Sequence, residues 1–158
     1  MAVSLNAQSA DKLTIQIRGQ TISAWRTADL ESAKKEAAAQ HKPIAWIASA
    51  PELLDGTGII SGVSSRAATL HEFYAFRDRT VLVFEDAYKE NHQVLQIVDD
   101  ALHTPNPHYT PPKVVFLNPD ATEVLATVEY ETNFIKRAHA LAGALKQAED
   151  KMSPTAPK

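Results

Sequence analysis

A short stretch near the start of the chain alternates strictly between apolar and polar residues. Leu13, Ile15 and Ile17 are each followed by a polar side chain, and the pattern stops near Gly19. A period of two predicts a half-buried β-strand over residues 13–18. Because its polar face would remain in contact with water, we expect this strand at the edge of a sheet.

Nearly continuous apolar runs predict further strands at residues 43–48, 80–85 and 113–118. The run 43–48 lacks polar alternation, which fits a central strand covered on both faces. The last of these runs is followed by Asn118-Pro119-Asp120-Ala121, which has the composition of a tight turn. Residues 123–130 then return as a strand, so the last two strands are predicted to form a hairpin.

Apolar residues at helical spacing predict four helices. The expected N-caps are Thr27 or Asp29, Ser64 or Ser65, Asn91, and Thr132, with ends near Gln40, Arg77, Leu102 and Ala148. The inward face expected for the second helix consists of Ala67, Leu70, Phe73 and Tyr74. The inward face expected for the last helix consists of Ile135, Ala138, Leu141, Ala142 and Leu145.

This alternation of strands and helices, closed by a hairpin, predicts a mixed sheet with helices on both faces. A chain of 158 residues suffices for one domain with its own core. We place this domain at residues 12–148, between a flexible N-terminus at 1–11 and a flexible tail at 149–158. Residues 49–64, with Pro51 and three glycines, are expected to form an unusually long loop.

Composition narrows the classes of partner. A hydrophobic fraction of 44% and a charged fraction of 22% are typical of a soluble globular protein. A net charge of −3 without a run of Lys or Arg argues against nucleic acid, and no apolar run approaches the roughly 20 residues of a membrane span. Residues 1–10 fit either the remainder of a removed signal peptide or an ordinary N-terminus, so a periplasmic or secreted location and a cytoplasmic one both stay open.

Three parts of the chain, taken in order, carry a resemblance to a known fold family. Ile22-Ser23-Ala24-Trp25, an alanine-rich helix from Asp29, and Lys42-Pro43-Ile44 are similar to the opening of bacterial thioredoxin-like domains. Residues 112–117 are similar to the family's cis-proline strand, and 118–124 to its hairpin turn. The order and spacing of these segments carry the resemblance more than any one of them.

The resemblance covers roughly residues 21–148. It implies a thioredoxin-like three-layer α/β/α fold with a mixed central sheet, to which residues 13–18 add an extra N-terminal strand. It also implies that Pro112 occupies the position of the family's cis-proline.

The chain departs from the family where the redox chemistry would lie. The family carries Cys-x-x-Cys a few residues after the central strand, but this chain reads Ser-Ala-Pro-Glu-Leu-Leu-Asp-Gly over 49–56 and contains no cysteine. Glu52 and Asp55 fall near the two cysteine positions. Disulfide exchange requires a thiolate, so thiol–disulfide oxidoreductase activity is excluded. Disulfides, thiolate metal sites and iron–sulfur clusters are excluded for the same reason.

These observations lead to the hypothesis of a non-redox thioredoxin-like module that binds or scaffolds a protein or peptide and needs no cofactor. The resemblance places the binding surface around the former redox loop and the cis-proline: Ser49, Pro51, Glu52, Asp55, Tyr109, Thr110, Pro111 and Pro112. Backbone groups beside a cis-proline can pair with an extended peptide, which is recognition by β-augmentation.

Two other interpretations stay open. Glu52, Asp55, His103 and His108 can be combined into a site for a metal or small ligand, with or without enzymatic activity, because histidine and carboxylates are common ligands. Against this, acidic residues also favour the first turn of a helix, and the histidine spacing matches no zinc signature. Alternatively, the strand at 13–18 can pair with a second copy, so we expect a monomer or a weak dimer.

Overall fold

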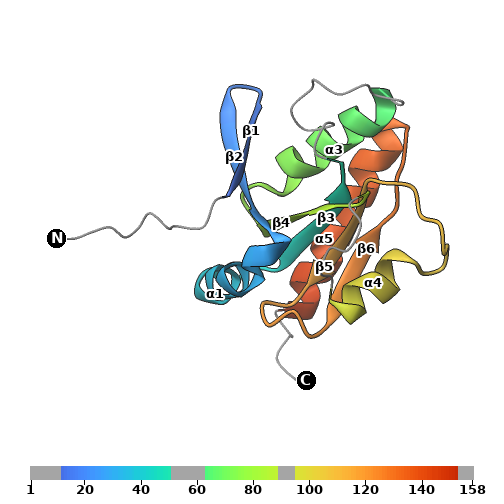
Figure 1. Ribbon diagram of the computed structural model, residues 1–158. Coiled ribbons are helices and arrows are strands. Elements are labelled where there is room, and N and C mark those ends of the chain that lie inside the picture. The colour runs from blue at the N-terminus through green and yellow to red at the C-terminus, as the bar shows by residue number, and fades with distance from the viewer. Residues whose placement is uncertain (1–11, 51–62, 89–94, 153–158) are drawn as a thin grey trace.

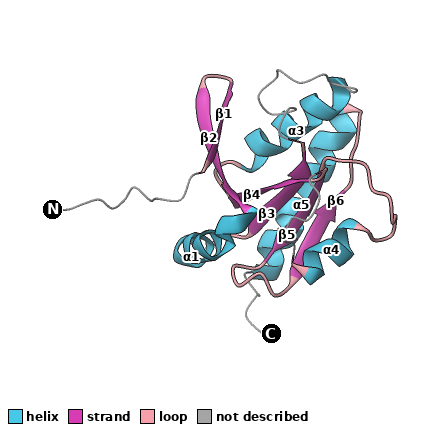
Figure 2. Ribbon diagram, in the orientation of Figure 1, coloured by secondary structure: helices cyan, strands magenta, loops and turns pink. Residues whose placement is uncertain are grey.

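Within the described residues, 12–50, 63–88 and 95–152, six strands form one mixed sheet with helices on both of its faces (Figure 1, Figure 2). The strands are β1 (Leu13–Ile17), β2 (Gln20–Arg26), β3 (Ile44–Ser49), β4 (Val81–Asp86), β5 (Lys113–Leu117) and β6 (Val124–Val128). The α-helices are α1 (Leu30–Gln40), α3 (Val63–Phe76), α4 (Gln96–Leu102) and α5 (Phe134–Met152).

The strand order across the sheet is β1-β2-β4-β3-β5-β6. β4 is parallel to both β2 and β3, whereas β5 is antiparallel to β3 and β6 is antiparallel to β5. The predicted fold class is therefore confirmed: a thioredoxin-like three-layer α/β/α fold with a mixed sheet. β1 is the extra N-terminal strand, and it lies at the edge as expected.

Each face of the sheet has its own apolar core. Alternate residues of β3 point to opposite faces, so Ala45 and Ile47 join the core that contains residues of α3 and α5, while Ile44, Trp46 and Ala48 join the core that contains residues of α1 and α4. All six residues of β3 are buried, as expected of a central strand. We call these the α3/α5 core and the α1/α4 core.

Strand β2 was missed by the sequence pattern. It forms a hairpin with β1 through a two-residue turn, in which Arg18 and Gly19 have φ angles of 52° and 76° and Ile17 pairs with Gln20. Positive φ at both central residues is the geometry that suits a tight hairpin. Only Ile22 and Ala24 of β2 are buried, so its alternation is too short to stand out. The hairpin rises away from the rest of the sheet (Figure 1), because β2 pairs with β4 only at its end.

Three of the four helix starts differ from those expected, whereas Asp29 occupies the N-cap position of α1 as predicted. Leu95 is extended, with ψ of 140°, and α4 begins at Gln96, so the predicted start at Asn91 is wrong; Asn91 itself lies outside the described residues. α5 is capped by Asn133, whose side chain accepts a hydrogen bond from the backbone N–H of Lys136 at 2.9 Å. α3 begins at Val63, before the two serines expected to cap it. A 3₁₀ turn at Thr27–Asp29 precedes α1, and Asp29 makes no side-chain cap hydrogen bond.

The buried faces of α3 and α5 agree with those expected only in part: Leu70, Phe73, Tyr74, Leu141 and Leu145 face the α3/α5 core as predicted. Ile135 is 68% exposed, and Ala142 and Ala67 are exposed as well. α5 instead buries Arg137, Leu141, Ala144, Leu145 and Ala148, and it continues to Met152, past the boundary expected near residue 148. α3 buries Ala68, Thr69, Glu72, Phe73 and Phe76. Each helix thus buries a charged residue, Glu72 in α3 and Arg137 in α5, that the pattern of apolar residues did not predict.

The two apolar residues Ile135 and Leu141 test the orientation of α5. Leu141 is 2% exposed in the α3/α5 core, so Leu141→Ala should lower the free energy of unfolding by about 3 kcal/mol through lost burial and a cavity. Ile135→Ala should change it by no more than about 0.5 kcal/mol, since the side chain is largely in water. Urea denaturation of both variants measures this. Equal losses would contradict the orientation.

Candidate functional site

The carboxyl ends of β3 and β4 lie side by side with the start of β5. The backbone N–H of Ala87 donates to the carbonyl of Ser49 at 2.6 Å, which ties the two parallel strands where they end. β5 runs in the opposite direction and begins with Lys113, which pairs with Ala48. In open α/β sheets, ligands bind beyond the carboxyl ends of the parallel strands. We therefore treat this edge, with the segment Tyr109–Pro112 that leads into β5, as the candidate functional site.

Several residues expected at the site are brought together here. Because Ala48 pairs with Lys113 in an antiparallel register, Ser49 comes next to Pro112, and Tyr109 to Pro111 continue outward from it. The peptide bond between Pro111 and Pro112 is cis. Pro51, Glu52 and Asp55 lie outside the described residues, so their part in the site stays a prediction.

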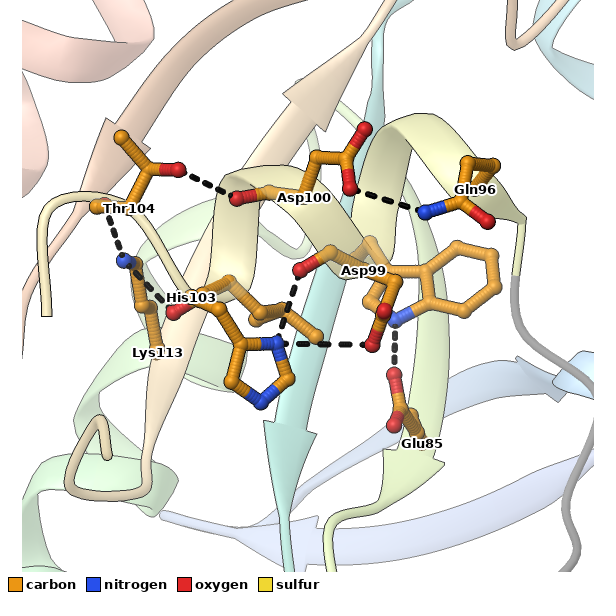
Figure 3. A network of polar contacts seen from close by, with 9 residues as sticks. Glu85, Gln96, Asp99, Asp100, His103, Thr104 and Lys113 are labelled. Carbon is orange, nitrogen blue, oxygen red and sulfur yellow. Dashed lines mark hydrogen bonds and ion pairs between the residues drawn. The ribbon is translucent and has the colours of Figure 1, made fainter. Parts of the chain in front are cut away.

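Lys113 is fully buried, and its ammonium group fixes the segment before β5 (Figure 3). Nζ donates to the carbonyl oxygens of Leu102 and Thr104, each at 3.0 Å, and lies 2.8 Å from a carboxylate oxygen of Glu129. An ammonium group has three donors, and all three have acceptors. The lysine thus connects the end of α4, the loop after it and the residue that follows β6.

A second polar group is buried on the α1/α4 side of the site. The indole Nε1–H of Trp46 donates to the carboxylate of Glu85 at 2.7 Å. The half-buried Tyr109 packs against the same core. Its ring and that of His103 are arranged edge-on, with ring centroids 5.2 Å apart. Burial, and next the negative charge of Glu85, raises the pKa of Tyr109 well above its ordinary value of 10. The phenol, which is protonated at neutral pH at its ordinary pKa, thus stays protonated to a higher pH than a surface tyrosine.

On the opposite face, the hydroxyl groups of Ser49 and Thr69 share a buried hydrogen bond of 2.8 Å. This bond joins the end of β3 to α3. Nucleophilic catalysis by a serine needs a base that accepts the hydroxyl proton, and among the described residues the bonded neighbour of Ser49 is another hydroxyl. Ser49 thus stabilises the edge of the site, and its buried side chain does not reach solvent.

His103 and His108 both lie exposed on the loop after α4. His103 is held through Nδ1, which lies 2.8 Å from the carbonyl oxygen of Asp99 and 3.4 Å from its carboxylate (Figure 3). His108 donates its backbone N–H to the Asn106 side chain. Within the part of the chain that the structure describes, no group of three or more His, Asp or Glu side chains is placed to hold a metal ion. The four-residue metal site cannot be assembled from these two histidines alone.

Glu72, one turn after Thr69 on α3, is a buried acid that the sequence pattern did not reveal. Its side chain is fully buried, and neither carboxyl oxygen has a hydrogen-bond partner among the described residues. Burial raises its pKa well above the ordinary 4.5, and the positive charge of Arg137 opposes this shift only in part. The carboxyl group is therefore held in its neutral form over a wider pH range than a surface glutamate.

The chain was compared with protein families, with curated proteins and with solved structures. No family model matches the chain, and no curated protein matches it. Among solved structures, the chain is similar to one described as DsbH oxidoreductase, with 19% sequence identity and a TM-score of 0.49. The similarity covers 79% of this chain and 85% of that chain. None of the helices in the described ranges has the length and apolar character needed to cross a membrane.

Lys113→Met tests whether the buried ammonium holds the loop. The substitution keeps the apolar stem but leaves two backbone carbonyls without a donor, so we expect the free energy of unfolding to fall by about 2 kcal/mol. Lys146→Met is the matched control, because Lys146 also lies 2.8 Å from a carboxylate but is 75% exposed. The control should change stability by no more than about 0.5 kcal/mol. Equal, small effects in urea denaturation would show that Lys113 is dispensable.

Glu72→Gln tests the buried carboxyl group through pH. Above pH 4.5 the unfolded chain releases the proton of Glu72, whereas the folded protein keeps it because its pKa is raised. The folded state therefore binds more protons, and the free energy of unfolding of the wild type falls as the pH rises toward the raised pKa. Removing the titration should make the free energy of unfolding of the variant fall less between pH 5 and pH 8 than that of the wild type. Urea denaturation at several pH values measures both curves. Parallel curves would contradict the assignment.

Proposed function

We propose that this protein is a non-redox binding module, and that the segment Tyr109–Pro112 binds an extended peptide of a partner protein. The absence of cysteine excludes disulfide exchange by this chain. The proposal therefore rests on what the edge of the site offers to a partner, namely backbone groups held in place by buried side chains.

The observation that carries the proposal is the backbone of Thr110, which has no partner among the described residues. Thr110 is exposed, and its N–H and C=O make no hydrogen bond to any residue that the structure describes. Because a proline follows it, its conformation is restricted to the extended region. An extended segment with free donors and acceptors is the element on which β-augmentation depends.

The segment is also anchored at both of its ends. Lys113 binds the carbonyl of Thr104 on one side and begins β5 on the other. Tyr109 is half-buried against the α1/α4 core. A segment that is ordered before binding loses less conformational entropy when a peptide adds to it, and this favours affinity.

Peptide selection with variants of Thr110 tests this proposal. Peptides selected from a random library on the whole protein should bind the wild type. Thr110→Pro removes the backbone N–H and should weaken their binding by about tenfold, the worth of one backbone hydrogen bond. Thr110→Ala keeps the N–H and should bind within about threefold of the wild type.

Two further measurements make the result decisive. Circular dichroism and the melting temperature establish that Thr110→Pro is folded, and methylation of alternate backbone nitrogens in the peptide should weaken binding to the unmodified protein. A proline variant that binds as well as the wild type, or peptides insensitive to methylation, would exclude β-augmentation at this edge. The failure to select any peptide would also count against the proposal.

A further inference from the structure

A cavity of about 510 Å³ lies away from the candidate site, between the turn of the β1–β2 hairpin, α3 and the start of α5. The hairpin stands beside α3 in Figure 1, and residues of both elements line the cavity. Its apolar walls include Ile17, Leu70, Tyr74 and Phe134. Phe134 is 55% exposed although it is a large apolar residue, so this surface is partly open to water.

The charges that line the cavity are all positive. Arg18 and Arg137 contribute guanidinium groups, and no acidic side chain is among the lining residues that the structure describes. The whole chain carries a net charge of −3, so the two cations of the described lining are opposite in sign to the protein's net charge. Such a site is complementary to a negatively charged ligand.

Arg137 is a buried cation that is held by neutral groups. Its side chain donates from Nε to His71 Nδ1 at 2.9 Å, and from Nη1 to the carbonyl oxygens of Glu131 and Thr132 at 2.8 and 3.3 Å. It is only 4% exposed, yet it forms no ion pair with a carboxylate among the described residues. Glu72 is buried nearby, but its oxygens make no hydrogen bond to Arg137.

These contacts leave donors for a ligand. Nη2 of Arg137 makes no hydrogen bond to a described residue, while the other nitrogens fix the plane of the guanidinium group. Since His71 accepts at Nδ1, its proton lies on Nε2, which is a second donor. Phe134 stacks on His71 with ring centroids 4.7 Å apart and holds the imidazole in place.

We propose that this cavity binds a small monocarboxylate with an apolar chain or ring. The carboxylate binds Arg137, which prefers planar oxyanions, and the apolar part lies against Leu70, Tyr74 and Phe134. Burying a charge without a counter-ion is unfavourable, so the bound carboxylate stabilises the guanidinium group as well. The apolar walls favour such a ligand over strongly hydrated anions such as phosphate or sulfate. The site is independent of the proposed peptide-binding edge.

Octanoate and octanamide, added to the whole protein at pH 7.4, form the first test. They share the apolar chain and differ in charge. Isothermal titration calorimetry should show binding of octanoate and at least about tenfold weaker binding of octanamide, because only the carboxylate makes charge-assisted hydrogen bonds. Backbone amide NMR signals that shift with octanoate should belong to α3, the start of α5 and the β1–β2 turn.

Three variants form the second test. Arg137→Gln should weaken octanoate binding by about tenfold or more. Because Arg137 also stabilises the fold, Ala67→Glu provides a second route: Ala67 is exposed on α3 and lines the cavity, so a carboxylate there should repel octanoate without disturbing the core. Ala142→Glu, at an exposed position of α5 that does not line the cavity, is the matched control and should leave binding unchanged.

The proposal would be overturned by any of three results. They are octanamide binding as tightly as octanoate, Ala67→Glu binding octanoate as well as Ala142→Glu does, and shifted NMR signals that lie away from the cavity. A protein that shows no octanoate binding at millimolar concentration would equally refute it. If Arg137→Gln fails to fold, the comparison of the two glutamate variants decides.

Discussion

The burial of β3 on both faces and both edges is the constraint on which the other elements depend. All six of its residues are buried, and it pairs with β4 on one side and β5 on the other. Each face must therefore be covered by helices, and every buried polar atom of the strand must find a partner inside the protein. Trp46 meets this demand through Glu85, and Ser49 through Thr69. The polar groups at the end of β3 are thus committed to holding the structure together.

This commitment explains why the described part of the candidate site offers backbone atoms more than reactive side chains. The charge of Lys113 is used on two carbonyl groups and on Glu129, and burial and Glu85 raise the pKa of the Tyr109 phenol further above neutral pH. What the described part of the edge leaves free is the main chain of Thr110. A site of this kind suits the recognition of a partner's backbone, in which affinity comes from main-chain hydrogen bonds.

The sequence predicted the sheet better than the helix faces, for a physical reason. Strand β3 and the hairpin of β5 and β6 are marked in the sequence by apolar runs and by a turn that contains a proline. These local signals indicate buried strands and a hairpin directly. β2 was missed because it buries only two residues, and Ile135 was misplaced because its apolar character fits a helix stripe although it lies in water. The site residues after Ser49 came from the family resemblance. Lys113, Glu72 and Arg137 were not predicted, since charged residues are almost never fully buried unless paired, and their partners are distant in sequence or are carbonyl groups.

Comparison of the two buried cations separates structural charges from a charge suited to a ligand. Lys113 uses all three donors and has a carboxylate at 2.8 Å, so its burial is explained by the fold alone. Arg137 is nearly as buried, but its described partners are an imidazole and two carbonyl groups, which supply no negative charge. It also lines a cavity whose other walls are largely apolar. The hydrogen bonds of Arg137 serve the fold, but its charge has no described counter-ion, and the proposed carboxylate ligand would supply one.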